Sequence, residues 1–252
     1  MVANLRWVTP LRRLTSLLAV VLLVGSLAAC GGSDTMTPRT VKTQCTYAAD
    51  PAGAAKKAEL PPGDPPKDEP TELTIATNQG DIKIGLDTKQ APCTVNAFVA
   101  LAKQGYFDNT HCHRLTTSGI FVLQCGDPKA TGAADDTTAG SGGPGFYTKD
   151  ELVENDPRLQ PCLDQTDPRS GKQFCTYTTG TVAMANAGPD TTGSQFFLVY
   201  KDSQLPNGFT VFGTMSAAGV KVVQSIAAAG AYPPNANGNT APKTEVLISS
   251  VK

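Results

Sequence analysis

The apolar residues of this chain recur mostly at every second position, in short runs separated by turns. Residues 73–77 and 82–86 alternate in this way on either side of a polar turn, which is the pattern of a β-hairpin. The same alternation is found in six further runs, at 112–115, 120–125, 181–185, 195–200, 210–213 and 245–251. A period of two places alternate side chains on opposite faces of a strand, so the pattern favours a mainly β fold.

Only two segments follow a helical period. One is expected to begin after Thr94, a plausible N-cap, and to end at Gly105, and the other covers 219–229. Residues 127–180 are rich in glycine and show no period, so an irregular region is expected there. Eight strands and two separate helices predict a closed antiparallel eight-stranded barrel capped by two α-helices.

The N-terminal residues have the features of a targeting signal. A basic start is followed by an apolar run over 17–24, which is shorter than the roughly 20 residues that cross a bilayer. The string Leu27-Ala28-Ala29-Cys30 resembles the bacterial lipobox, and this implies cleavage before Cys30 and a lipid such as palmitate on its sulfur. The alternative is a secretory signal peptide with an incidental cysteine. Both readings place the protein outside the cytoplasm, and the lipobox reading anchors it to the bacterial cell membrane through Cys30.

The chain therefore divides into three parts. Residues 1–29 are expected to be a lipoprotein signal peptide, and 30–70 a lipidated cysteine with a proline-rich tether. Residues 71–252 are expected to form one folded domain. Cys45 and Tyr47 indicate that part of the tether is attached to that domain.

The charge balance argues against nucleic acid as a partner. The formal net charge is -1, and removal of the first 29 residues would leave 18 basic and 22 acidic side chains. Binding to phosphates requires a basic surface that releases counterions, so no nucleic acid is expected.

Six cysteines remain besides Cys30. An even number outside the cytoplasm suggests disulfides, and no two of the six form a Cys-x-x-Cys pair or a zinc ribbon. Sequence leaves 15 pairings open, of which Cys162 with Cys175 is the simplest. His111, Cys112 and His113 would point to alternate faces of a strand, so no metal site and no cofactor are predicted. The six are Cys45, Cys93, Cys112, Cys125, Cys162 and Cys175.

Residues 184–197 read Met-Ala-Asn-Ala-Gly-Pro-Asp-Thr-Thr-Gly-Ser-Gln-Phe-Phe. Over these 14 contiguous positions the chain resembles the central signature of the cyclophilin family of peptidyl-prolyl cis-trans isomerases. Residues 113–115 and 119–127 resemble its catalytic strand pair, and Leu205 with 211–213 fits its next segment. The resemblance extends over about 73–252. It implies isomerase activity on X-Pro bonds, with proline-containing unfolded or exported polypeptides as clients and a monomer as the working form.

The resemblance also assigns roles to residues. Arg114 would be the catalytic donor to the amide nitrogen, and Phe121 and Phe197 would do most of the enclosing of the proline ring. The residues that the resemblance places around the substrate are Phe121, Val122, Phe197, Leu205 and Phe209 for the apolar slot and groove, and Gln124, Ala185, Asn186 and Gln195 for the peptide backbone. Of the latter, Asn186 would act through its main chain, and Gln195 partly by orienting Arg114.

Two departures from the family pattern bear on these roles. Between Arg114 and Phe121 the chain has two residues more than is usual, and Gln204 and Phe209 stand where eukaryotic members have tryptophan and histidine. Weak cyclosporin binding with retained isomerase activity is therefore expected. The alternative function is a catalytically weak module that binds proline peptides or acts as a chaperone.

The expected roles also bear on one disulfide. If Arg114 and Gln124 both face the groove, Cys112 shares their face and Cys125 faces away. A Cys112–Cys125 bridge would then require a bulge, and this pairing stays open.

Overall fold

The computed structural model describes residues 44–252. The predicted signal peptide, Cys30 and the first part of the tether lie outside the described residues. Among the helices of residues 44–252, none combines the length and apolar character that crossing a bilayer requires.

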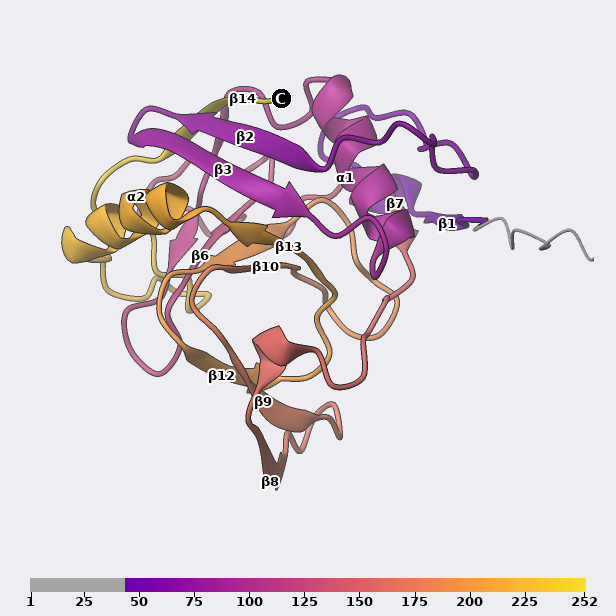
Figure 1. Cartoon of the computed structure of the whole chain (residues 1–252). Coiled ribbons are helices and arrows are strands. Elements are labelled where there is room, and N and C mark those ends of the chain that lie inside the picture. The colour runs from indigo at the N-terminus through magenta and orange to yellow at the C-terminus, as the bar shows by residue number, and fades with distance from the viewer. Residues whose placement is uncertain (1–43) are drawn as a thin grey trace, which may run out of the picture. The chain divides into compact units, whose positions relative to one another are not determined.

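One curled antiparallel sheet forms the body of the domain (Figure 1), with strand order β4-β14-β2-β3-β13-β10-β11-β6-β5. Its strands are β2 (Glu72–Thr77), β3 (Gly80–Leu86), β4 (Thr110–His111), β5 (Arg114–Leu115), β6 (Val122–Cys125), β10 (Thr181–Met184), β11 (Phe196–Val199), β13 (Val211–Met215) and β14 (Leu247–Val251). The outermost strands, β4 and β5, are separated along the chain only by Cys112 and His113. The sheet therefore curls until both of its edges reach the same segment.

The predicted mainly β fold is confirmed, with nine strands in this sheet instead of eight. The strand expected at 112–115 is replaced by two short strands, because the segment pairs with β14 through Thr110–His111 and with β6 through Arg114–Leu115. Each half of the segment thus serves a different edge of the sheet.

Both predicted helices are present, and the first begins earlier than expected. α1 (Pro92–Lys103) starts with proline in its first turn, where the missing N–H costs nothing. The prediction that Thr94 caps it is wrong, because the backbone N–H groups of Cys93 and Thr94 donate to the carboxylate of Glu151 at 3.0 and 2.8 Å. α2 (Ala217–Ala228) is capped by its own neighbour Ser216, whose hydroxyl accepts from the N–H of Gly219.

The interior consists of two hydrophobic clusters on opposite faces of β6, β10 and β11. In the larger cluster the ring of Phe98 lies 4.9 Å from those of Phe107 and Phe212 and 5.2 Å from that of Phe196. The smaller cluster contains Phe197. Consecutive side chains of a strand point to opposite faces, so β11 sends Phe196 into the main core and Phe197 to the other side.

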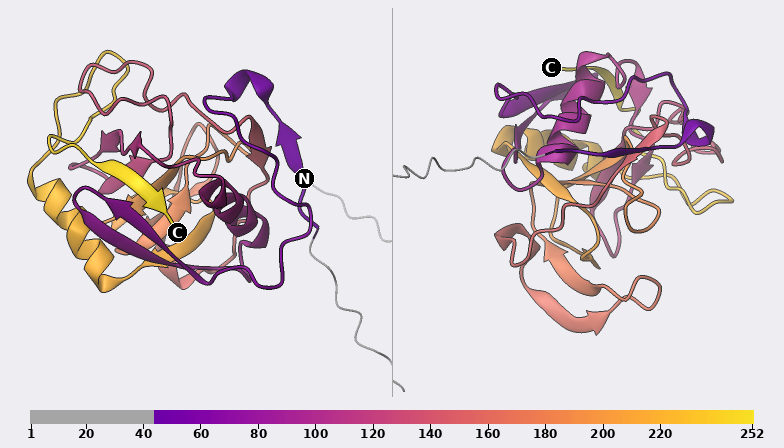
Figure 2. Two further views of the ribbon diagram at one scale, coloured as in Figure 1. Left: turned by 90° about the horizontal axis from the view of Figure 1, so that it is seen from above. Right: turned by 90° about the vertical axis from the view of Figure 1, so that its right-hand side faces the viewer.

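The region 127–180 is more regular than predicted. It contains β7 (Phe146–Thr148), the 3-10 helix η2 (Pro157–Leu159) and the hairpin of β8 (Cys162–Thr166) and β9 (Gln173–Tyr177). This hairpin forms a second sheet with β12 (Ser203–Pro206), in the order β12-β9-β8, and projects away from the main sheet (Figures 1 and 2). A Cys162–Cys175 disulfide joins its two strands.

From Cys45 onward, the residues expected to be a tether lie against the domain. A Cys45–Cys93 disulfide connects them to α1, and β1 (Tyr47–Ala49), which precedes the 3-10 helix η1 (Pro51–Gly53), pairs with β7. The amide of Asn96 also donates to the Tyr47 hydroxyl at 2.6 Å. The sequence indication that Cys45 and Tyr47 attach this segment is confirmed.

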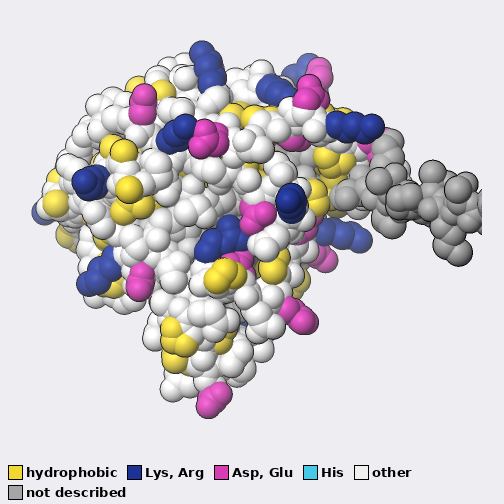
Figure 3. Space-filling view, viewed as in Figure 1, with side chains coloured by type: hydrophobic (Ala, Val, Ile, Leu, Met, Phe, Trp, Pro, Cys, Tyr) yellow, Lys and Arg dark blue, Asp and Glu magenta, His cyan; other side chains and the backbone are white. Residues whose placement is uncertain are grey.

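The third disulfide joins Cys112 to Cys125, both fully buried in the larger cluster. The strand is interrupted at Cys112 and His113, and this interruption supplies the irregularity that the pairing was expected to need. On the face shown in Figure 3, basic and acidic side chains are interspersed, and no large area carries one sign of charge.

Candidate functional site

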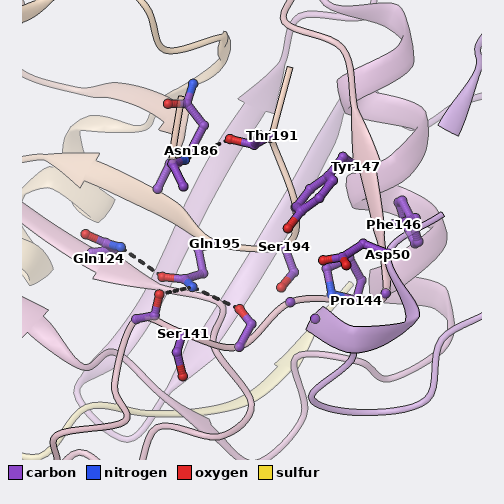
Figure 4. Close-up of a pocket in the computed structure, with 18 residues that line it drawn as sticks. Asp50, Gln124, Ser141, Pro144, Phe146, Tyr147, Asn186, Thr191, Ser194 and Gln195 are labelled. Atoms are coloured by element: carbon purple, nitrogen blue, oxygen red, sulfur yellow. Dashed lines mark hydrogen bonds between the residues drawn. The ribbon is translucent and has the colours of Figure 1, made fainter. Parts of the chain in front are cut away.

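A chain of three polar side chains crosses β5, β6 and β11. The guanidinium Nη1 of Arg114 donates to Oε1 of Gln124 at 3.3 Å, and Nε2 of Gln124 donates to Oε1 of Gln195 at 2.9 Å. The amide of Gln195 in turn donates to the carbonyls of Gly140 and Gly142, both at 2.9 Å (Figure 4). Gln195 was expected to orient Arg114, and it reaches Arg114 through Gln124.

The strand register brings these residues together. Arg114 is opposite Gln124 across β5 and β6, and Gln124 is opposite Phe197 across β6 and β11. The polar side chains and the apolar cluster around Phe197 therefore lie next to each other on the same sheet.

Arg114 is half-buried, and burial lowers the pKa of its guanidinium below the ordinary value. Arginine nevertheless stays charged at physiological pH. Within residues 44–252 it forms no ion pair with a carboxylate. Its remaining N–H groups are thus available to a ligand.

His113, next to Arg114, is fully buried and neutral. Burial lowers the pKa of its imidazole to about 4, the charge of Arg114 acts in the same direction, and Asp127 opposes both. Neither ring nitrogen finds a hydrogen-bond partner in the described part of the chain, where no group of histidine, cysteine, aspartate or glutamate side chains could hold a metal ion. A neutral imidazole adds no second positive charge beside Arg114.

The apolar side of the site is built around Phe197. Its ring contacts that of Phe209 edge-on, with centroids 5.5 Å apart, and that of Tyr177 at 6.1 Å. Val122 belongs to the same cluster, and Ala185, Leu205 and Phe209 pack against it. Every residue predicted for the apolar slot except Phe121 is therefore brought together.

Phe121 lies elsewhere, and the prediction that it encloses the slot with Phe197 is wrong. Its ring contacts that of Tyr200 at 6.0 Å, and the ammonium of Lys201 lies 4.3 Å above its centroid. Ile120 packs against the Phe197 cluster in its place. The two additional residues before Phe121 form a turn at Gly119, which has a positive φ of 75°. Val122 belongs to the cluster around Phe197, and consecutive side chains of an extended chain point to opposite faces, so Ile120 points towards that cluster and Phe121 away from it.

Ile120 and Tyr177 also belong to this apolar wall, and neither was predicted from the sequence. Tyr177 is buried beside Phe197, and its hydroxyl donates to the carbonyl of Pro206 at 3.2 Å. It lies in the hairpin of β8 and β9, which has no family signature, so only the folded hairpin reveals it.

Two cavities meet at Asn186 and Ala187. The larger, of about 490 Å³, is bordered by Ile120, Leu205 and Phe209 and by the β8–β9 hairpin. The smaller, of about 170 Å³, lies on the other side and is lined by Gln124, Gln195 and the glycine-rich run 140–145 (Figure 4). Together they form one groove, which reaches the polar chain at Gln124 and Gln195 and the apolar wall at Leu205 and Phe209. Arg114 and Phe197 lie behind these residues and line neither cavity.

Asn186 and Ala185 stand at the centre of this groove. The side-chain amide of Asn186 donates to the carbonyl of Gly208 at 2.8 Å and so fixes the loop before Phe209. The N–H of Ala185 donates to the carbonyl of Gln195 at 2.9 Å. The side chain of Asn186 is therefore occupied, consistent with the expectation that this residue serves a peptide through its main chain.

Comparisons with known proteins bear on this groove. Residues 72–252 match the family model described as "Cyclophilin type peptidyl-prolyl cis-trans isomerase/CLD". A protein of Mycobacterium tuberculosis named "Probable peptidyl-prolyl cis-trans isomerase B" is 44% identical over 216 residues, which are 82% of this chain and 63% of that protein. The chain thus spans less than two thirds of that relative's length.

In two further matches, the aligned region covers most of the matched protein. A Helicobacter pylori peptidyl-prolyl cis-trans isomerase is 38% identical over 155 residues, which are 61% of this chain and 78% of that protein. A crystal structure of a Cryptosporidium parvum cyclophilin-type peptidyl-prolyl cis-trans isomerase superposes with a TM-score of 0.52 at 27% identity, over 72% of this chain and 95% of that one.

Proposed function

Because this chain belongs to the family of cyclophilin-type peptidyl-prolyl cis-trans isomerases, we propose that it catalyses rotation about X-Pro bonds in the groove beside Arg114. The observation that carries the proposal is the placement of a half-buried guanidinium, held by Gln124, next to the apolar wall around Phe197.

The reaction explains why these residue types suffice. Rotation about a peptide bond meets a barrier of roughly 18–20 kcal/mol, because the nitrogen lone pair is delocalised into the carbonyl. Uncatalysed X-Pro isomerisation takes about 10–100 s, so turnover in milliseconds requires the barrier to fall by on the order of 5 kcal/mol. That reduction needs preferential binding of the twisted amide, without a nucleophile or a metal.

Each part of the groove has a task in that binding. In the twisted amide the nitrogen regains its lone pair and accepts a hydrogen bond, for which the guanidinium of Arg114 is the nearby donor. The wall of Val122, Phe197, Leu205 and Phe209 would hold the proline ring in a surface that excludes water. Gln195, fixed by two backbone carbonyls, keeps the polar chain rigid.

One observation favours the alternative, a binding module with slow turnover. The displacement of Phe121 leaves Ile120 where an aromatic ring was expected, so the slot encloses the proline less completely. A groove of this kind would still bind proline peptides.

A protease-coupled assay on an X-Pro peptide, with binding measured in parallel, separates the two functions. The wild type is expected to accelerate isomerisation, and Phe197→Ala to lower kcat/KM about tenfold because it removes the centre of the apolar wall. Phe121→Ala, the matched control, should stay within about threefold of the wild type. An inactive wild type that binds the peptide would establish the module instead, and equal losses in both variants would contradict the assignment of the wall.

We also propose that the protein acts outside the cytoplasmic membrane, where it assists the folding of exported proline-containing chains and is held by a lipid on Cys30. The support is the apolar run over 17–24 followed by Leu-Ala-Ala-Cys, and the three disulfides, which persist in oxidising compartments.

Cell fractionation tests the lipid anchor. Wild type is expected in the membrane fraction, and Cys30→Ala should lose the anchor. Intact mass should show acyl chains on the wild type only. A wild-type protein of unmodified mass in the soluble fraction would refute the anchor.

A further inference from the structure

We propose that Asp50 makes the smaller cavity selective for peptides that carry a lysine or arginine close to the isomerised X-Pro bond. This inference rests on the proposed function and names the substrate class that the groove prefers. Asp50 lies before the family-matched region, which begins at residue 72, so the selectivity would come from the segment attached in front of that region.

The position of Asp50 is fixed by three independent contacts. The Cys45–Cys93 disulfide holds the segment on α1, and β1 pairs with β7 up to Ala49 opposite Phe146. The N–H of Asp50 itself donates to the carbonyl of Gly145 at 2.8 Å. A carboxylate on a well-held backbone can discriminate between side chains, because little ordering is needed when a ligand binds.

Asp50 is the only charged residue among those that line this cavity. Figure 4 shows it beside Tyr147 on one side of the cavity, with Gln124 and Gln195 on the other. The nearby carboxylate of Asp50 raises the pKa of the Tyr147 phenol. Within residues 44–252 no lysine or arginine pairs with Asp50. Its negative charge is therefore left for a ligand.

A helix-capping role does not occupy the carboxylate. Asp50 stands at the N-terminus of η1, but its side chain makes no hydrogen bond to the N–H groups of that turn. Gly53, which would collide with the carboxylate if it carried a side chain, lines the same cavity. The carboxylate therefore lies at the cavity wall and caps no backbone N–H group of η1.

The size and position of the cavity suit one long basic side chain of a bound peptide. Its volume of about 170 Å³ exceeds what one water molecule needs and is less than the roughly 300 Å³ at which small-molecule pockets begin. It joins the larger cavity at Asn186 and Ala187, so a peptide held in the groove passes its entrance. Pro144 and the ring of Tyr147 offer apolar contact to an aliphatic stem whose charged end reaches Asp50.

A peptide series tests the proposal. Lysine, its neutral analogue norleucine, or glutamate is placed in turn at each of three positions on either side of X-Pro, and kcat/KM is measured for wild type, Asp50→Asn and Asp81→Asn. Asp81 is exposed on β3, so its variant is a control for the same change of charge. The wild type is expected to prefer lysine over norleucine about fivefold at one position. Asp50→Asn should abolish that preference, and Asp81→Asn should keep it.

The preference for lysine over norleucine is also expected to decrease as salt is added, since salt screens a partly exposed ion pair. Equal rates for lysine and norleucine at every position in the wild type, or a preference that survives in Asp50→Asn, would overturn the proposal. If no peptide is turned over, the proposed function has failed. Calorimetric binding of the lysine and norleucine peptides to wild type and Asp50→Asn then decides the role of Asp50 on its own.

Discussion

Replacing Arg114 with alanine is expected to lower kcat/KM for an X-Pro peptide by about 100-fold or more, since removal of one donor to the transition state typically costs that much. The side chain is half-buried and hydrogen-bonded to Gln124, and it has no carboxylate partner in the described part of the chain. Its removal leaves no buried charge without a partner, so the fold should persist. The protease-coupled assay measures the activity, and circular dichroism checks the fold.

Arg114→Lys is the matched control for charge. Lysine keeps the positive charge but loses the planar fork of N–H groups, so an intermediate loss of about tenfold is expected. Peptide affinity should change little in either variant, because the donor is needed mainly when the amide is twisted. Wild-type turnover in Arg114→Ala would remove Arg114 from the mechanism, and an equal loss of binding and turnover would make it a ground-state contact.

Loss of the Cys112–Cys125 disulfide is expected to cause a large drop in stability. The bridge spans 13 residues, and the chain-entropy model assigns a loop of this length about 3 kcal/mol. For a domain of this size, that corresponds to a fall in Tm of roughly 6–12 °C. Thermal unfolding of the double variant Cys112→Ala/Cys125→Ala under oxidising conditions measures it. Activity at low temperature should also fall, since the bridge joins the two strands next to the Arg114–Gln124 pair.

The double variant Cys162→Ala/Cys175→Ala is the matched control, because its bridge also spans 13 residues. It lies in the projecting hairpin, which can open locally while the main sheet stays folded. We expect less than half the fall in Tm. Equal falls in the two double variants would show that loop length alone sets the effect, and that the position of the core bridge adds nothing.

Much of the main sheet followed from local sequence. Residues 73–86 have a strict alternation and a turn between the runs, so the β2–β3 hairpin was predictable within one residue at most of its ends. Phe196 and Phe197 are consecutive residues of one strand, and they lie on opposite sides of it. The groove residues around 184–197 were predictable because this stretch is similar to a family signature.

Three features were not predictable, because each depends on residues distant in sequence. The start of α1 is set by Glu151, which no local capping rule could indicate. The β8–β9 hairpin is stabilised by β12 and by a disulfide, and its own sequence shows little alternation. Phe121 lies on the other side because it directly precedes Val122, whose side chain packs in the cluster around Phe197, and this register is set by the pairing of β6 with β11.

By itself, the sequence determined which chemistry the groove can offer: a permanent cation, amides and an apolar wall, all carried by residues whose strand positions follow from their alternation. Only the tertiary structure decided which aromatic ring faces the groove, which cysteines pair, and that Asp50 reaches the smaller cavity. The physical reason is that alternation fixes the side of a strand on which a residue lies, whereas the packing of loops and of the N-terminal segment depends on contacts that close only when distant parts of the chain meet.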